Sequence, residues 1–184
     1  IVPSLLARKF DLVISGMTVT DERRKTVAFS DKITDIPYRV IVKHGSGLDG
    51  SPASMKGRKV GVLKGSTEAD YAEKYYAKAG AMVQRYESTQ QVYLDLASGR
   101  LDAALGNLVE MKMGFLAKPE GKPFEFAPYE MKDVAILGYG TGAAMRKNDA
   151  KLKADFNAAL KAIRANGSYQ KIAARYFDFD VYGQ

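Results

Sequence analysis

Short apolar runs with the character of β-strands alternate along this chain with longer segments that have helical spacing. Chains with this alternation form α/β folds, in which helices pack on largely parallel sheets. The predicted strands are Leu12 to Ile14, Arg39 to Val42, Lys59 to Leu63, Met82 to Tyr86, Ala103 to Leu105 and Val134 to Leu137. Helical spacing is found between them, at Glu68 to Ala79 and Gln90 to Ala97. With 184 residues, the chain can form one domain or two small lobes.

A further helix is predicted near the end of the chain. Apolar residues recur there at intervals of four, four and three residues: Leu152, Phe156, Leu160 and Ile163. This spacing predicts one buried helical stripe. Asn148 or Asp149 is suited to cap the start of the helix, and Gly167 is suited to end it.

The composition excludes several kinds of site. There is no cysteine, which rules out disulfides and thiolate metal sites, and the single histidine, His44, leaves little material for a multi-histidine metal centre or a Ser-His-Asp triad. The net charge of +7 is spread over amphipathic segments without a dense basic block, which favours a solubilising role over nucleic-acid binding. No apolar run is long enough to cross a bilayer. We expect no metal, no cofactor and no nucleic-acid partner.

Two segments of the chain resemble each other weakly. Residues 7–15 and residues 98–106 share a helix end, a basic residue, an apolar residue, an aspartate and a strand. Two similar units predict two sheets. The carboxyl ends of the two strands, at Ser15 and at Asn107, are natural places for ligand groups, because ligands of α/β folds bind beyond the carboxyl ends of strands.

The segment from Asp11 to Arg23 has the chemistry of a carboxylate site. An apolar strand leads into three hydroxyl side chains that can donate and accept hydrogen bonds: Ser15, Thr18 and Thr20. Arg23 adds a planar, permanently charged guanidinium that can bond both oxygens of one carboxylate. The alternative is a solvated helix start, since arginine near threonines is common on protein surfaces.

Residues 60–68 combine a strand, a glycine turn and hydroxyl side chains at the start of a helix. The free N–H groups of a helix start, aided by the helix dipole, can bind a carboxylate or a phosphate. The alternative is an ordinary N-cap formed by Ser66 or Thr67. The segment lacks the glycine and lysine spacing of a dinucleotide fingerprint or a Walker loop.

An ordered set of motifs along the chain resembles one protein family. The motifs are Ile14 to Arg23, Gly61 to Thr67, Gly99 to Ala103, Gly138 to Gly142 and Tyr176 to Gly183. Together they resemble the extracytoplasmic polar amino acid receptors of bacterial ABC importers. More narrowly, they are similar to the lysine/arginine/ornithine and histidine binding proteins and to related opine receptors. The resemblance covers essentially the whole chain, and the set of motifs is specific although each motif alone would be weak.

The resemblance implies an α/β fold of the type II periplasmic binding protein class. Two α/β lobes would be joined by two crossing strands and would close on one ligand in the cleft between them. Residues 1–36 and 137–184 would form lobe 1, and residues 37–136 would form lobe 2. The family's opening strand, its aromatic ligand clamp and its glycine-phenylalanine-aspartate phrase have no counterpart in the sequence. We therefore expect lobe 1 to be incomplete, either because the chain is a fragment or because an early segment is not included.

The resemblance also implies a set of ligand-binding residues. Thr18 would bond the carboxylate and the amino group of the ligand, Arg23 would pair with the carboxylate, and Thr67 would donate a backbone N–H to it. The other implied residues would lie against the ligand or near its side chain: Ser15, Gly16, Leu63, Ser66 and Glu68. Asn107 stands where such receptors usually place an aspartate for the ligand ammonium, which favours a substituted amine, as in opines, or weaker binding. An acidic group such as Glu68 could compensate.

The predicted function is to bind an amino acid or an amino acid derivative, a basic amino acid or an opine, and to deliver it to the membrane permease of an ABC importer. The resemblance implies export by a signal peptide, action as a monomer, and a location in the periplasm or on an extracytoplasmic lipid anchor in a Gram-positive organism. Two alternatives remain open. One is an enzyme resembling cyclohexadienyl dehydratase, with Glu68 or Glu110 as its general acid, and the other is the ligand-sensing module of a receptor. The sequence does not identify the ligand.

Overall fold

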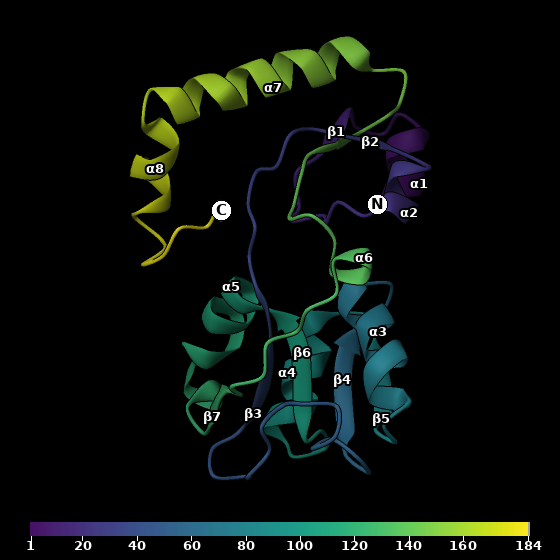
Figure 1. Ribbon diagram of the computed structural model, residues 1–184, viewed down its shortest axis with the longest axis vertical. Helices are drawn as coiled ribbons and strands as arrows, with labels where there is room; N and C mark the ends of the chain where they lie inside the picture. Colours follow the sequence, from purple (N-terminus) through teal and green to yellow (C-terminus); the bar gives the residue numbers. More distant parts are fainter. Residues whose placement is uncertain (184) are drawn as a thin grey trace. The chain divides into compact units, whose positions relative to one another are not determined.

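The computed structural model describes residues 1–183, and the chain divides into two compact units (Figure 1). Unit 1 comprises Ile1–Ile36 together with the chain from Gly138 onward, and unit 2 comprises Pro37–Leu137. The second boundary predicted from the sequence lies one residue earlier, after residue 136. The chain therefore passes from one unit to the other twice, at residues 36–37 and at residues 137–138.

Unit 2 is built on a five-stranded sheet with the strand order β5-β4-β6-β3-β7. The strands are β3 (Tyr38–Lys43), β4 (Lys59–Leu63), β5 (Met82–Tyr86), β6 (Ala103–Asn107) and β7 (Phe124–Phe126). Strand β4 pairs in parallel with β5 and β6, whereas β3 runs antiparallel to β6 and β7. The middle strands β3, β4 and β6 are mostly buried and rich in valine, leucine and alanine, as expected for a sheet covered on both faces.

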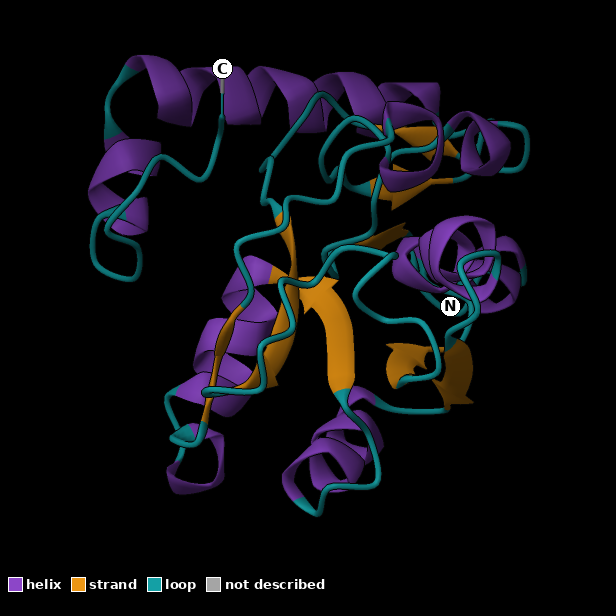
Figure 2. Ribbon diagram, turned by 60° about the horizontal axis from the view of Figure 1, so that its bottom comes forward, coloured by secondary structure: helices purple, strands orange, loops and turns teal. Residues whose placement is uncertain are grey.

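Helices cover both faces of this sheet (Figures 1 and 2). They are α3 (Thr67–Tyr71), which continues as the π-helical segment η1 (Ala72–Ala77), α4 (Thr89–Ala97), α5 (Leu108–Met111), which continues as η2 (Lys112–Leu116), the 3₁₀ turn η3 (Pro119–Gly121) and α6 (Val134–Leu137). Val40 and Val42 of β3 belong to the core cluster that contains Tyr76 of η1. Ile41, between them, belongs to the cluster formed with α4 and η2. Because successive residues of a strand point to opposite faces, α3 with η1 and α4 with η2 cover opposite faces of the sheet.

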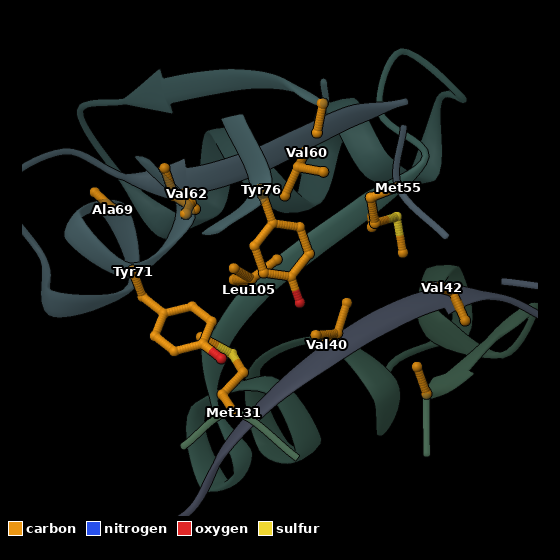
Figure 3. Close-up of a cluster of buried hydrophobic side chains, with 14 of the residues drawn as sticks. Val40, Val42, Met55, Val60, Val62, Ala69, Tyr71, Tyr76, Leu105 and Met131 are labelled. Carbon is orange, nitrogen blue, oxygen red and sulfur yellow. The ribbon is translucent and has the colours of Figure 1, made fainter. Parts of the chain in front are cut away.

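The larger core of unit 2 surrounds Tyr76 (Figure 3). Its ring lies among the side chains of Val40, Val60 and Leu105. Its hydroxyl group donates a hydrogen bond of 2.5 Å to the carbonyl oxygen of Gly50. Because a buried hydroxyl group without an acceptor would cost about 1–3 kcal/mol, this bond fixes the loop at Gly50 to η1.

Unit 1 contains a small antiparallel sheet with the order β1-β8-β2. Its strands are β1 (Leu12–Val13), β2 (Ala28–Phe29) and β8 (Ala144–Met145), and its helices are α1 (Val2–Leu6), α2 (Asp21–Arg24), α7 (Ala150–Ala165) and α8 (Ser168–Ala173). Single bridges from Thr141 to Thr18 and to Thr34 continue the pairing beyond β8. The expectation of parallel strands is wrong for this unit. Strand β8 follows unit 2 in the sequence and lies antiparallel to both β1 and β2.

Residues Val134–Leu137 form helix α6 and not the predicted strand. Asp133 explains the difference. Its side-chain Oδ1 accepts a hydrogen bond of 3.1 Å from the backbone N–H of Ala135, and its carbonyl oxygen accepts one of 2.7 Å from the N–H of Leu137. An aspartate in this position supplies acceptors that start a helix, and here it outweighs the strand-like composition of four apolar residues.

Helix α7 buries less of its apolar stripe than the sequence predicted. Leu160 is buried, Leu152 and Phe156 are half-buried, and Ile163 is 40% exposed. The spacing correctly predicts the helix, but spacing alone does not say how much apolar surface packs against the stripe. Within residues 1–183, no helix has both the length and the apolar character that crossing a membrane requires.

The start of α7 differs from the expected side-chain cap. Asp149 occupies the N-cap position but makes no capping hydrogen bond, because its carboxylate pairs with the guanidinium of Arg146, where Oδ2 lies 2.7 Å from Nε. At the other end, Gly167 follows the C-cap residue with a φ of +78°, as expected for a glycine that ends a helix.

Gly138 lies at the point where the chain re-enters unit 1, and it has no room for a side chain. A Cβ atom built on Gly138 would lie 2.4 Å from the carbonyl oxygen of Val19 and 2.6 Å from Cγ2 of Thr18. Its φ of +72° is also a conformation that favours glycine. The contact holds the segment Gly138–Gly142 against the backbone that carries Thr18.

We expect Gly138→Ala to destabilise the chain by clearly more than Gly167→Ala. Both glycines have a positive φ, so each alanine pays about 1–2 kcal/mol of left-handed strain. Only position 138 adds a clash with backbone, because no atom lies within 4 Å of a Cβ built on Gly167. Urea denaturation of both variants measures the difference, and equal losses in the free energy of unfolding would contradict the packing described here.

Candidate functional site

In unit 2, five of the predicted site residues lie at one edge of the sheet. The parallel strands β4 and β6 end there, at Leu63 and Asn107. The antiparallel strand β3 begins at the same edge, where Tyr38 pairs with Asn107. This edge corresponds to the place where ligands of α/β folds bind. We refer to these five residues as the sheet-edge cluster: Leu63, Ser66, Thr67, Glu68 and Asn107.

The turn from β4 into α3 is formed by Gly65 and Ser66. Gly65 has a φ of +70°, and the side-chain Oγ of Ser66 accepts a hydrogen bond of 3.1 Å from the backbone N–H of Ala69. Ser66 is therefore the N-cap, as one of the two interpretations of the sequence proposed. The remaining N–H groups of the first turn have no carbonyl partner within the helix, so they are suited to bind an anion.

Thr67 is buried, and its hydroxyl group is used within unit 2. Its Oγ1 donates to the hydroxyl oxygen of Tyr38 at 3.3 Å and to Oε2 of Glu68 at 3.2 Å. A hydroxyl group has one hydrogen, so these two acceptors share it. The backbone N–H of Thr67, and not its hydroxyl group, is therefore the part of this residue suited to a ligand.

Burial raises the pKa of the Glu68 carboxyl above its ordinary value, and the charge of nearby Glu110 adds to the rise. Hydrogen bonds to Ser66 and Thr67 oppose it. A cation close to this carboxyl would favour the charged form again. Among the residues that the structure describes, no group of three or more histidine, aspartate or glutamate side chains is arranged to hold a metal ion.

Asn107 is the N-cap of α5. Its Oδ1 accepts a hydrogen bond of 2.9 Å from the backbone N–H of Glu110. The amide oxygen keeps one further lone pair, and the amide nitrogen keeps its donors. An aspartate would accept the same capping bond, so the cap does not require the neutral amide.

In unit 1, the structure brings Thr18 and Arg23 together. Thr20 is the N-cap of α2, and its Oγ1 accepts a hydrogen bond of 3.2 Å from the backbone N–H of Arg23. The guanidinium of Arg23 donates through Nη1 to the carbonyl oxygen of Thr18 at 3.0 Å. Thr18 itself is buried and bridges to Thr141. The segment is thus a capped helix start in which the side chain of Arg23 points back to the backbone of Thr18.

Arg23 is half-buried, in contrast to its exposed neighbour Arg24. Within residues 1–183, no acidic side chain forms an ion pair with Arg23. A half-buried guanidinium with a single backbone acceptor still has N–H donors that require acceptors, and a carboxylate matches them best. These contacts favour an anion site over the fully solvated helix start.

Ser15 and Gly16 lie on the exposed loop that follows β1. Gly16 has a φ of +69°, and no atom lies within 4 Å of a Cβ built on it. Ser15 and Gly16 are therefore accessible to a ligand.

Tyr38 is not among the site residues predicted from the sequence, although its hydroxyl oxygen accepts the hydrogen bond of Thr67 and its backbone pairs with Asn107. The signal available in the sequence was its position between Pro37 and the predicted strand Arg39 to Val42. Recognising its role required the antiparallel pairing of β3 with β6, which brings the start of one strand beside the end of the other.

Two relatives are similar to the chain along its whole length. The chain is 46% identical over 183 residues to the lysine/arginine/ornithine-binding periplasmic protein of Escherichia coli (strain K12), a match that covers 100% of the chain and 70% of that protein. It is 44% identical over 183 residues to the L-arginine-binding protein of Pseudomonas aeruginosa, with 100% and 71% covered.

A solved structure supports the same relationship. An ancestral arginine-binding protein bound to arginine superposes with a TM-score of 0.85 at 31% identity, covering 96% of this chain and 75% of that one. The predicted α/β fold of type II periplasmic binding proteins is therefore confirmed. Residues 1–179 match the sequence pattern of one family as a whole. The chain belongs to the bacterial extracellular solute-binding proteins, family 3.

Proposed function

We propose that this chain binds an amino acid or an amino acid derivative, either a basic amino acid or an opine, and delivers it to the permease of an ABC importer. The names of the two relatives support a basic amino acid, since one is named for lysine, arginine and ornithine and the other for L-arginine. Membership of an extracellular family supports action outside the cytoplasm, in the periplasm or on a lipid anchor. The protein acts as a monomer in this proposal.

The position of Arg23 carries the proposal. Its half-buried guanidinium is held by the carbonyl of Thr18 and has no acidic partner among the described residues. A ligand carboxylate would complete its charge-assisted hydrogen bonds. Thr18 would bond the same carboxylate and the amino group, and the exposed loop at Ser15 and Gly16 would lie against the ligand.

The sheet-edge cluster would bind the other side of the same ligand. The backbone N–H of Thr67 would donate to the carboxylate, while Leu63 and Ser66 would lie near the ligand side chain. Glu68 would supply negative charge to a basic side chain, and Asn107 would face the amine. Units 1 and 2 would then be the two lobes of the receptor. Micromolar affinity needs about 8 kcal/mol, which one guanidinium–carboxylate pair and several donors in a closed site can reach.

A second candidate is a dehydratase that acts on cyclic carboxylic acids. The raised pKa of Glu68 favours it, because a general acid must keep its proton near the working pH. The sheet-edge cluster, however, contains no lysine, histidine or cysteine that would assist a carboxyl group in catalysis. We therefore expect binding without turnover. Incubation with a prephenate-like acid followed by mass spectrometry checks this, and conversion of the acid would favour the enzyme.

Replacement of Arg23 by alanine tests the proposed carboxylate site. Calorimetric titration with L-arginine, L-ornithine and octopine, an N-carboxyethyl derivative of arginine, first identifies a ligand of the unaltered chain. We expect Arg23→Ala to weaken the binding of that ligand by about 2–4 kcal/mol, because the buried carboxylate loses its charged partner. Arg24→Ala, which removes the same charge from the exposed neighbouring position, is the control and should bind normally. Unchanged affinity in Arg23→Ala would remove this residue from the site.

Replacement of Asn107 by aspartate tests the class of ligand. Aspartate keeps the cap of α5 and adds a counter-charge, so we expect tighter binding of amino acids with a primary ammonium, by about tenfold, since charge-assisted hydrogen bonds are roughly twice as strong as neutral ones. Octopine, whose amine is substituted, should gain less. Asn107→Ser, which can cap without a charge, is the control. If the primary amines gain nothing, the amide of residue 107 does not face the ligand amine.

A further inference from the structure

The segment from Tyr129 to Leu137 leads the chain out of unit 2, and it is tied to the helix formed by α3 and η1. The hydroxyl groups of Tyr71 and Tyr129 lie 3.1 Å apart, within hydrogen-bond distance. Met131 and Leu137 belong to the same core cluster as Tyr71, and Figure 3 shows Met131 beside the Tyr71 ring. The last residues of unit 2 before the crossing therefore pack on this helix.

Asp133 makes the polar connection between the two elements. Its Oδ2 accepts hydrogen bonds from Nζ of Lys74 and from the hydroxyl group of Tyr75, both at 2.8 Å. Its Oδ1 accepts the bond from Ala135 that starts α6. The side chain is only 11% exposed. The hydrogen bonds from Lys74 and Tyr75 hold the pKa of this carboxyl below its ordinary value, so it is charged at neutral pH.

The helix that Asp133 holds is the helix that begins at the sheet-edge cluster. Thr67 and Glu68 form its first turn, and Lys74 and Tyr75 lie further along in η1 without a break in the helix. A shift of the helix relative to α6 would therefore also shift its first turn.

After α6, the chain forms backbone hydrogen bonds with Val19, which is next to the proposed ligand residue Thr18. The backbone N–H of Tyr139 donates to the carbonyl oxygen of Val19 at 3.0 Å, and the N–H of Val19 donates to Gly140 at 2.8 Å. Gly138 packs against Thr18 without space for a side chain. Residues 133–140 thus touch the helix of Thr67 at one end and the strand end of Thr18 at the other.

We propose that Asp133 is a positioning residue for ligand binding. It does not contact the ligand in this proposal, which rests on the proposed function of the two ligand segments. The carboxylate fixes α3 and η1 to the segment that leads the chain out of unit 2, through its hydrogen bonds to Lys74 and Tyr75. A ligand then meets Thr67 on a helix that is already held in place, so less conformational entropy is lost on binding.

Asp133→Ser tests the proposal in the full chain. Serine can still cap α6, but it is too short to reach Lys74 and Tyr75. The double variant Lys74→Met, Tyr75→Phe removes the same connection from the helix side and leaves Asp133 in place, so it decides the question if Asp133→Ser does not fold. Glu73→Gln is the matched control. Glu73 precedes Lys74 in η1 and forms an ion pair with Arg85 of β5. The substitution breaks this ion pair without touching the bonds of Asp133.

Each variant is titrated with the probe that binds the unaltered chain best among L-arginine, L-ornithine and octopine, and the dissociation rate is measured by stopped flow. We expect Asp133→Ser and the double variant to weaken binding by about 3- to 30-fold, mainly through faster dissociation, and Glu73→Gln to change it by less than about twofold. Affinity and dissociation rate equal to the Glu73→Gln control would overturn the role of Asp133. Failure of the unaltered chain to bind any probe would instead reject the proposed function.

Discussion

The hydrogen bond from the guanidinium of Arg23 to the carbonyl of Thr18 would determine where the proposed carboxylate site of unit 1 lies. This half-buried guanidinium has one backbone acceptor, and its remaining N–H donors match the geometry of a carboxylate. The backbone at Thr18 is itself held by Gly138 to Gly142, which pack against it and share hydrogen bonds with Val19. The proposed carboxylate site of unit 1 therefore depends on the segment by which the chain returns from unit 2.

In unit 2, the same residues shape the fold and offer ligand groups. Ser66 and Asn107 cap the helices that follow β4 and β6, and Thr67 uses its hydroxyl group to bond Tyr38. These hydrogen bonds do not use the backbone N–H of Thr67, the amide nitrogen of Asn107 or all the acceptors of Glu68. The proposal assigns these groups to a ligand. Because capping and the proposed binding fall on the same residues, substitutions that preserve the cap test binding without disturbing the helix.

Much of the fold and of the candidate site could be predicted from local sequence. The incorrect predictions have physical causes. Strands β4 and β5 have the predicted bounds, because apolar runs between turn residues mark them. The four apolar residues of α6 are too few to distinguish a helix from a strand by periodicity, and the deciding signal was the preceding Asp133. Tyr38 was missed because its neighbours come from pairing across 69 positions of sequence, between residues 38 and 107, which no local pattern encodes.

The central proposal is that the Arg23 segment and the sheet-edge cluster bind one ligand together. Titration of the isotope-labelled chain with L-arginine, followed by NMR, tests it most directly through the side-chain Nε–H of Arg23 and the backbone N–H of Thr67. We predict that both signals shift along the titration with the same dissociation constant. A shift at one of them without the other, or two different dissociation constants, would contradict a shared ligand.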